Sequence, residues 1–386
     1  ESSFLGDFFE RRRNKSKRSE IMKGNQQTVA STERMVDYDH NSYMQNQMVR
    51  SRAEMMRDAV ERIGPVVPEF TVMDYGCGPG HSALNAVAPV IEAYRRIAPQ
   101  GVIAIRHSDQ PGNDWNALFA LVFGPDGYQR NESRIRTEAA IGSFYTQLAV
   151  PGSVALGTCF AASHWLSRAL SPSSPGTVWF ADLQGEARAE FAALARADWT
   201  QFLRCRAAEL RPGGMVIVST LGSVPDASEI NGIRASARKV YRAIFDVANQ
   251  MVTDGLLEKS ALDHFVFPFW FPTMAEVRAP LNEESDLKEA FEIVQATLTP
   301  APIHPNDVFE DSLNDPETYA RLYAGYIRGF SESTLRLHLF GPSAKNAAEV
   351  DALTEEFFAR LTRYYQAEPG QHAFETMPLT LVLHRR

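Results

Sequence analysis

The stretch from Phe70 to Gly80, FTVMDYGCGPG, decides the fold of this chain. Its apolar first half, which ends at Asp74, predicts a short buried strand, and Gly76, Gly78 and Gly80 follow at once. Because glycine lacks a Cβ atom, such a loop lets the backbone approach a ligand closely and adopt positive φ angles. The stretch therefore predicts a strand that leads into a ligand-binding loop.

The segments on either side of this loop continue an alternating pattern. Apolar residues at helical spacing precede the strand at 51–63, and we expect a second helix at 82–97 and a second strand at 101–107. This order of strand, loop, helix and strand predicts a parallel sheet with helices on its faces. Further along the chain we expect strands at 152–157, 215–220 and 379–384, and an amphipathic helix at 187–208.

Between residues 225 and 370 the pattern changes to long helical stretches, which we expect at 233–254, 273–281, 285–292, 316–340 and 347–365. The chain then has three expected parts. They are a flexible basic tail at 1–30, an α/β core formed by 31–224 and 371–386, and a helical substrate cap at 225–370, inserted before the last strand. A ligand of an open α/β sheet sits beyond the carboxyl ends of the strands, where such a cap would exclude water.

Composition limits the classes of partner. The formal net charge of −8 argues against nucleic acid, because phosphate-binding proteins usually carry a basic surface. The three cysteines are odd in number and widely spaced, which favours neither a disulfide framework nor a metal site and predicts a cytoplasmic location. No apolar run approaches the roughly 18 to 20 residues that cross a bilayer, so we expect no membrane partner. The basic run at 11–18 predicts a solvated tail, with a nuclear address as the alternative.

Two acidic residues narrow the class of ligand. Asp74 ends the first strand, where it can hold a cationic amine or a hydroxyl, and Asp109 follows the next strand, where a carboxylate commonly accepts both hydroxyls of a ribose. The glycine spacing does not match the dinucleotide fingerprint, and the phosphate-binding motif that ends in Gly-Lys-Ser/Thr does not occur. A ribose-bearing ligand without pyrophosphate therefore fits better than NAD or ATP.

Several short motifs in a fixed order carry a resemblance to one family. They are NSYMQ at 41–45, DYGCGPG at 74–80, SDQPGNDWN at 108–116, GSFY at 142–145, WLS at 165–167, FLRCRA at 202–207, NQMV at 249–252 and FWFPT at 269–273. With these motifs, residues 36–386 resemble the SABATH methyltransferases, which include carboxyl methyltransferases and N-methyltransferases. The resemblance implies a Rossmann-like class I methyltransferase core with a helical cap, S-adenosylmethionine as methyl donor, S-adenosylhomocysteine as its product, and a homodimer.

The resemblance also implies site residues, position by position. Asp74 would hold the methionine end of the donor and Asp109 its ribose. The other expected cofactor contacts are Tyr38, Ser42, Gly76, Ser82, Gln110, Ser143 and Phe144. Ser82 departs from the family, which has an asparagine there.

In the substrate pocket, Gln45 and Trp165 would bind the acceptor carboxylate and serve as the catalytic pair. The other expected contacts are Ala161, His164, Val240, Tyr241 and Ile327, and no metal is expected. The family has a tyrosine where this chain has Ala161, which would open space in the pocket. An arginine such as Arg328 would favour a second acidic group on the substrate if it pointed inward.

The chemistry fits these residue types. Methyl transfer to a carboxylate is an in-line displacement by an anion, so it requires no general base. The amide of Gln45 and the indole of Trp165 are neutral hydrogen-bond donors that can orient the anion without a strong ion pair. We therefore expect an enzyme that forms the methyl ester of a small carboxylic acid. The alternatives are an N-methyltransferase for a small heterocycle, a non-catalytic ligand receptor and, more remotely, an NAD-dependent oxidoreductase.

Overall fold

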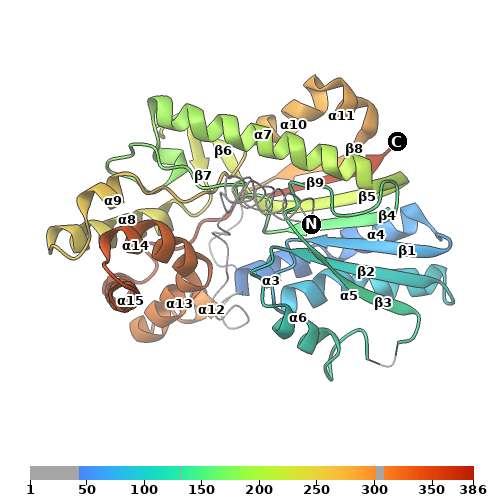
Figure 1. Cartoon of the computed structure of the whole chain (residues 1–386), viewed down its shortest axis with the longest axis horizontal. Helices are drawn as coiled ribbons and strands as arrows, with labels where there is room; N and C mark the ends of the chain where they lie inside the picture. Colours follow the sequence, from blue (N-terminus) through green and yellow to red (C-terminus); the bar gives the residue numbers. More distant parts are fainter. Residues whose placement is uncertain (1–42, 131, 301–307) are drawn as a thin grey trace, which may run out of the picture. The chain divides into compact units, whose positions relative to one another are not determined.

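The computed structural model describes residues 43–130, 132–300 and 308–386, which all belong to the compact unit Glu33–Arg386. Among these residues, seven strands form one sheet in the order β3-β2-β1-β4-β5-β9-β8 (Figure 1). The first five strands pair in parallel, whereas β9 is antiparallel to both of its neighbours. The strands are β1 (Glu69–Tyr75), β2 (Val102–Asp109), β3 (Ile135–Ile141), β4 (Val154–Phe160), β5 (Leu210–Leu221), β8 (Phe291–Leu298) and β9 (Pro378–Arg385).

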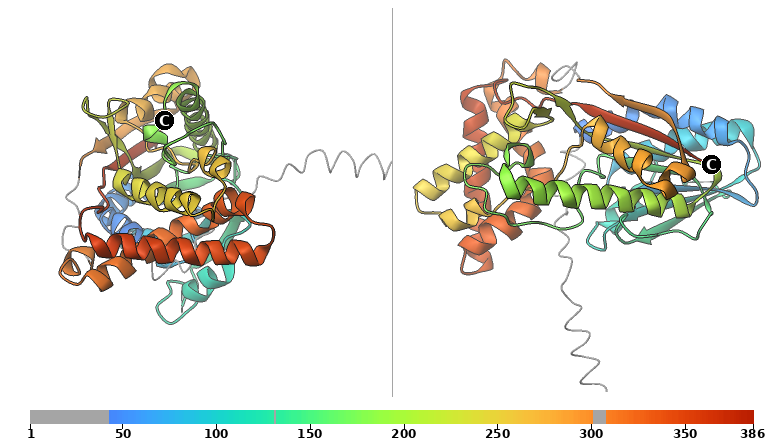
Figure 2. Two further views of the ribbon diagram at one scale, coloured as in Figure 1. Left: turned by 90° about the vertical axis from the view of Figure 1, so that its left-hand side faces the viewer. Right: turned by 90° about the horizontal axis from the view of Figure 1, so that it is seen from above.

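Helices cover both faces of this sheet. On one face, Met56 and Val60 of α4 (Ala53–Ile63) and Val87 of α5 (His81–Ile97) pack against Phe70 and Val72 of β1. The opposite face is covered by α7 (Gly185–Glu209), α10 (Met274–Glu283) and α11 (Ser285–Ala290), as Figure 2 shows. Two shorter helices, α3 (Tyr43–Arg50) and α6 (Trp115–Val122), complete this part. Because β1 is buried on both faces, its sequence is an almost continuous apolar run.

A helical cap lies at one end of the sheet (Figure 1). Its core is aromatic: the rings of Tyr323 in α13 and Tyr365 in α15 stack with centroids 4.8 Å apart. Asp315 begins α13 by accepting a hydrogen bond from the backbone N–H of Thr318, with Pro316 in the first turn. The cap elements are η1 (Phe180–Asp182), β6 (Ser223–Pro225), β7 (Ile233–Ala235), α8 (Arg238–Thr253), α9 (Lys259–Asp263), α12 (Val308–Asp311), α13 (Pro316–Leu335), η2 (Arg336–Phe340), α14 (Gly341–Ser343) and α15 (Ala347–Ala367).

The structure confirms the α/β class and the cap before the last strand, but it corrects the cap's composition. A helix was predicted through 285–292, yet α11 ends at Ala290 and residues 291–298 form strand β8 at the edge of the main sheet. The predicted helix at 233–254 begins only at Arg238, because 233–235 pairs with β6. Local sequence misses β8 because its strand state depends on pairing with β9, about 80 residues later.

The predicted tail at 1–30 and the predicted contacts Tyr38 and Ser42 lie outside the described residues. Within residues 43–130, 132–300 and 308–386, no helix is long and apolar enough to span a membrane.

Candidate functional site

The glycine loop after β1 packs tightly against the segment that follows β4, at the carboxyl ends of the parallel strands. Gly76 has a φ of +73°, and a Cβ atom there would lie 2.4 Å from the Cβ of Ala162, so only glycine fits. Asp74, just before it, is buried and contacts two polar groups: the Thr158 hydroxyl donates to one carboxylate oxygen at 3.2 Å, and His107 Nδ1 lies 3.1 Å from the other. Asp74 is therefore held in one orientation beside the loop.

The carboxylate of Asp109 holds the same loop from the end of β2. It accepts hydrogen bonds from the backbone N–H groups of Gly78 and Gln110, each at 2.7 Å. Burial raises the pKa of Asp109 from its ordinary value of 3.8 to about 6, although the two backbone donors oppose the shift. At neutral pH Asp109 is an oriented acceptor, as a ribose diol requires.

The loop at 142–149 lies against the glycine loop. It carries Ser143 and Phe144, and the Phe144 ring lies 3.6 Å from where a Cβ of Gly76 would stand. Arg206 of α7, which is fully buried, donates to the carbonyl oxygens of Phe144 at 3.0 Å and Thr146 at 3.2 Å. The guanidinium thus fixes the backbone of Ser143 and Phe144, two of the predicted cofactor contacts.

Glu209 completes this arrangement from the end of the same helix. It is fully buried and forms an ion pair with Arg206 at 2.8 Å. Its carboxylate accepts from the backbone N–H of Ala149 at 3.2 Å, and it also accepts from the N–H of Leu148 and the hydroxyl of Tyr75. A buried ion pair with this many partners rigidifies its surroundings. The sequence motif at 202–207 contains Arg206 but not Glu209, and no local pattern revealed the role of either residue.

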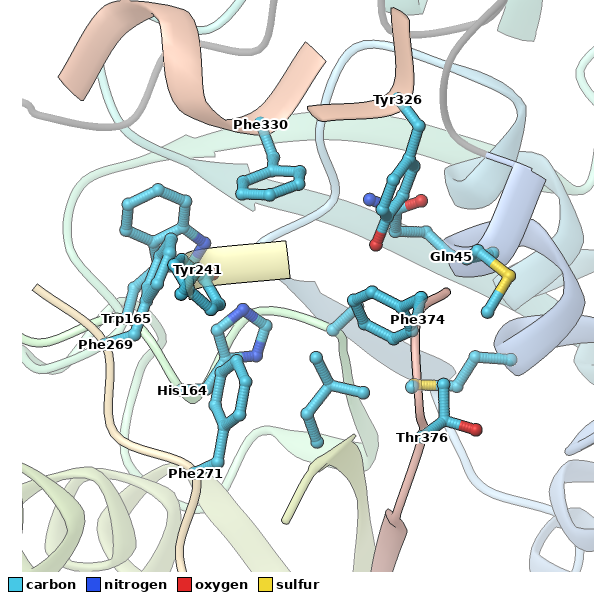
Figure 3. A pocket seen from close by; sticks show the side chains of 14 residues that line it. Gln45, His164, Trp165, Tyr241, Phe269, Phe271, Tyr326, Phe330, Phe374 and Thr376 are labelled. Atoms are coloured by element: carbon cyan, nitrogen blue, oxygen red, sulfur yellow. The ribbon is translucent and has the colours of Figure 1, made fainter. Parts of the chain in front are cut away.

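A cavity that spans about 590 Å³, open solvent at its mouth included, lies between the core and the cap (Figure 3). Gln45 of α3 and Trp165, which follows β4, face it from opposite sides. Gln45 Oε1 is buried and has no hydrogen-bond partner within the described residues. Unpartnered buried amide oxygens are rare, so this atom is available to a hydrogen-bond donor, while the N–H group of the same amide can donate to an anion. The complete lining is Met44, Gln45, Met48, Ala161, His164, Trp165, Leu221, Tyr241, Phe269, Phe271, Tyr326, Phe330, Phe374 and Thr376.

Aromatic rings form most of this wall. Trp165 and Phe269 meet edge to face, with centroids 3.9 Å apart, and His164 packs edge to face on Phe271 at 5.2 Å. His164 Nδ1 lies 2.9 Å from the Thr220 hydroxyl, and burial lowers the pKa of His164 to about 3. The imidazole is therefore neutral at physiological pH, which makes it a polar wall group and not a cation.

A smaller cavity of about 260 Å³ adjoins the glycine loop, and Gln45 lines it together with Asp74, Gly76 and Ser82. Gln45 therefore borders both cavities. The Ser82 hydroxyl donates to the side chain of Asn46 at 3.1 Å, so it ties α5 to α3.

We call the larger of these two cavities, between the core and the cap, the acceptor cavity. Five of the predicted substrate contacts line it and two do not. Gln45, Ala161, His164, Trp165 and Tyr241 lie around it. Ala161 has a φ of +51°, a left-handed conformation that is uncommon for alanine. Val240 and Ile327 are fully buried in the cap core and do not line the cavity. Val240 precedes the lining residue Tyr241, and Ile327 follows the lining residue Tyr326.

Sequence reasoning missed the lining residues that come from distant segments. Tyr326, Phe330, Phe374 and Thr376 stand on α13 and on the segment before β9. The helical spacing of Tyr326 and Phe330 was the available signal, because residues four apart share one face of a helix.

Two further observations concern potential metal ligands and the thiol of the glycine loop. The described part of the chain contains no group of three or more His, Cys, Asp or Glu side chains placed to hold a metal ion. Cys77 in the glycine loop is buried, and burial raises the pKa of its thiol well above the ordinary value. It is therefore a packing residue and not a nucleophile.

Residues 26–386 match the sequence model of the family described as SAM dependent carboxyl methyltransferase. The chain belongs to this family. Its donor is S-adenosylmethionine, and family members convert carboxylic acids into methyl esters. The residues described above fit that donor: Asp74 and Asp109 are oriented acceptors beside a close-approach glycine loop.

Curated relatives and one solved structure extend this result. Gibberellic acid methyltransferase 1 of Arabidopsis thaliana is 28% identical over 291 residues, which cover 70% of this chain and 75% of that protein. Salicylate carboxymethyltransferase of Clarkia breweri is 28% identical over 284 residues, with 68% and 76% covered. The structure titled "Loganic acid methyltransferase with SAH" shares the fold with a TM-score of 0.69 at 20% identity, covering 90% of this chain and 96% of its own.

Proposed function

We propose that this enzyme methylates a small acid with one carboxylate and an apolar body, and that Gln45 and Trp165 hold the carboxylate. The observation that carries this proposal is the position of Gln45, which borders both the cavity beside Asp74 and the aromatic cavity that contains Trp165. A group held there lies between the proposed donor and acceptor sites. This is where an in-line transfer must occur.

The reaction requires the protein to position the acceptor and to exclude water from it. When bound, S-adenosylmethionine supplies an electrophilic methyl group on a sulfonium. A carboxylate is already an anion at neutral pH, so the protein need only strip its water and align one oxygen with the methyl group. Correct positioning contributes on the order of 7 to 11 kcal/mol to such reactions. Gln45 and Trp165 donate neutral hydrogen bonds, which leave the nucleophilic charge on the oxygen.

The lining favours an acid without a second charge. None of the described residues that line the acceptor cavity is Asp, Glu, Lys or Arg. Arg328 donates to Glu332 at 2.6 Å and also pairs with Glu355, so it does not supply a counter-charge inside the cavity. Ala161 leaves room where the family has a tyrosine. These observations support an apolar monocarboxylic acid over a dicarboxylic one.

Seven residues of the described part are proposed to hold the donor. Asp74 would contact its amino acid end and Asp109 its ribose hydroxyls. The remaining proposed contacts are Gly76, Ser82, Gln110, Ser143 and Phe144. The proposed contact of Ser82 has less support than the other contacts, because the Ser82 hydroxyl already donates a hydrogen bond to Asn46.

Variants of the two carboxylate-binding residues test the proposal. We expect Gln45→Ala and Trp165→Phe each to lower kcat/KM for acid methylation by roughly tenfold to a hundredfold, since each removes a hydrogen bond to an anion worth about 1.5 to 3 kcal/mol. S-adenosylhomocysteine affinity, measured by calorimetry, should change less than about twofold. The matched control is Gln47→Ala, which changes a glutamine of the same helix that bonds Tyr43 instead.

The acid itself is identified by screening aromatic, terpenoid and aliphatic mono- and dicarboxylic acids with labelled donor. Unchanged ester formation in both variants would contradict the proposed carboxylate-binding pair. A product that resists alkaline hydrolysis would instead indicate transfer to nitrogen.

We also propose that the enzyme acts as a cytoplasmic homodimer, with residues 1–30 as a basic tail and 225–370, apart from α10, α11 and β8, as the substrate cap. The family resemblance supports the dimer, and three buried thiols support a reducing compartment. Light scattering after size-exclusion chromatography measures the oligomeric state, and a monomeric mass would contradict the dimer.

A further inference from the structure

A second and larger cavity lies behind the wall of the acceptor cavity. It spans about 1180 Å³, open solvent at its mouth included, between α7, α10 and the end of β5. Neither Asp74, Asp109 nor Gln45 lines it, so it belongs neither to the donor site nor to the carboxylate-binding pair. His164 is the residue that this cavity shares with the acceptor cavity.

Two short extended segments, joined by the antiparallel bridge between Trp165 and Phe269, separate the two cavities, and we call them the ribbon. Leu166 N–H donates to the Pro268 carbonyl at 2.8 Å, and Trp270 N–H donates to the His164 carbonyl at 2.9 Å. Side chains on extended strands alternate between faces. Accordingly, Trp165, Phe269 and Phe271 line the acceptor cavity, whereas Leu166, Trp270 and Pro272 line the second cavity.

The second cavity owes its size to small side chains on facing helices. Ala192 and Ala195 of α7 and Ala279 of α10 face it, and the rings of Trp199 and Trp270 form its broader walls. Protein interiors rarely leave voids larger than a water molecule. Concave sites with mostly apolar walls and few polar groups are typical of small-molecule binding, and apolar cavities take up apolar ligands.

The charges around this cavity are already paired. Arg196 forms an ion pair with Glu283 at 2.8 Å, and both side chains are about half exposed. Glu276 accepts hydrogen bonds from the backbone and hydroxyl of Thr273 in a capping box. Because His164 is neutral, the lining offers no unpaired positive charge to an anion. An occupant of this cavity is therefore uncharged, unlike the acid in the neighbouring one.

We propose that this second cavity is a binding site for a neutral, apolar small molecule, with an entrance at the Arg196–Glu283 ion pair that joins α7 to α10. Exposed ion pairs contribute only about 0 to 1 kcal/mol, so the entrance opens at little cost. The site is independent of methyl transfer, because binding to it needs neither donor nor acid. Its failure and that of the proposed reaction are thus distinguishable.

The test uses the neutral fluorescent probe N-phenyl-1-naphthylamine and the full chain without donor. The wild type should bind the probe saturably. The double variant Ala192→Leu/Ala195→Leu fills the cavity with good helix formers and should raise the dissociation constant at least tenfold. The matched control, Ala193→Leu/Ala197→Leu, changes exposed alanines of the same helix and should shift it less than twofold.

Two results would overturn the proposal: no saturable binding to the wild type, or equal affinity in the filled and control variants. Thermal unfolding establishes that both double variants are folded. If the α7 double variant does not fold, Ala279→Leu narrows the cavity from α10 and should weaken probe binding in the same direction. Unchanged affinity in this variant contradicts the proposal equally.

Discussion

Two regions of the site differ in how they use charge. Beside the glycine loop, Asp74 and Asp109 each contact two polar partners, and the Arg206–Glu209 ion pair holds the adjoining loop. In the acceptor cavity, the described lining residues carry no charge. The donor is the same molecule in every turnover, so a fixed charged network suits it. The acceptor must stay anionic and reactive, which neutral aromatic walls permit.

The largest effect should follow from breaking the charged region. Arg206→Met leaves Glu209 buried without its ion-pair partner, and such losses destabilise proteins by about 3 to 5 kcal/mol. The loop with Ser143 and Phe144 loses two hydrogen bonds at the same time. We expect a lower free energy of unfolding in urea and weaker S-adenosylhomocysteine binding. A variant as stable as wild type would show that the network does not hold the loop.

The exposed ion pair between Arg204 and Asp286 provides the control on the same helix. Arg204→Met should change stability by less than about 1 kcal/mol, because exposed pairs contribute little.

The next effect concerns Asp109. Asp109→Asn should weaken S-adenosylhomocysteine binding by roughly tenfold to a hundredfold, since hydrogen bonds to charged groups contribute about 1.5 to 3 kcal/mol. The raised pKa of about 6 also predicts a pH dependence. Below this pH the wild-type carboxylate is protonated and affinity should fall, whereas the variant should show no such step. Calorimetry between pH 5 and 8 measures both.

The raised pKa of Asp109 also makes the stability of the ligand-free protein depend on pH, with stability falling as the pH rises. The folded state holds the Asp109 proton more tightly than the unfolded chain does. This contribution to stability is therefore complete below pH 3.8 and is lost as the pH rises to about 6. Asp109→Asn should remove this loss from urea titrations carried out across that range.

A smaller effect should follow at His164, on the neutral side of the comparison. Because its pKa is lowered to about 3, it stays uncharged across the working range. His164→Gln keeps a polar, neutral side chain, and we expect kcat/KM to change without any change in the shape of its pH profile between 5 and 8. A wild-type ionisation near pH 6.5 that disappears in the variant would give His164 an acid–base role.

The smallest effect is expected at Ala161. Its left-handed backbone costs alanine about 1 to 2 kcal/mol, and glycine relieves this strain but loses about 0.5 to 1 kcal/mol through its freer unfolded state. Ala161→Gly should therefore raise the free energy of unfolding by about 0 to 1.5 kcal/mol. Ala155→Gly in β4, at a buried strand position, should be destabilising. Equal destabilisation by both would mean that Ala161 is unstrained.

The sequence predicted the places of Asp74 and Asp109 in the fold better than it predicted which residues line the acceptor cavity. Asp74 and Asp109 are fixed by strand ends, and strand ends are visible as breaks in apolar runs. The acceptor wall combines segments up to about 330 residues apart, and its helical members depend on rotation about the helix axis. Val240 and Ile327 missed the cavity by one residue each for this reason. The roles of Arg206 and Glu209, like strand β8, depend on tertiary partners that no local pattern contains.

The alternation along the ribbon has a consequence for how this enzyme can diversify. A substitution at Phe269 or Phe271 reshapes the acceptor cavity, while one at Trp270 or Pro272 reshapes the cavity behind it. Substitutions at neighbouring positions therefore reshape different cavities, and a change in one cavity need not disturb the other. His164 is the exception, since it belongs to both walls. Directed evolution of acid preference should therefore randomise the odd-numbered ribbon positions and leave position 164 constant.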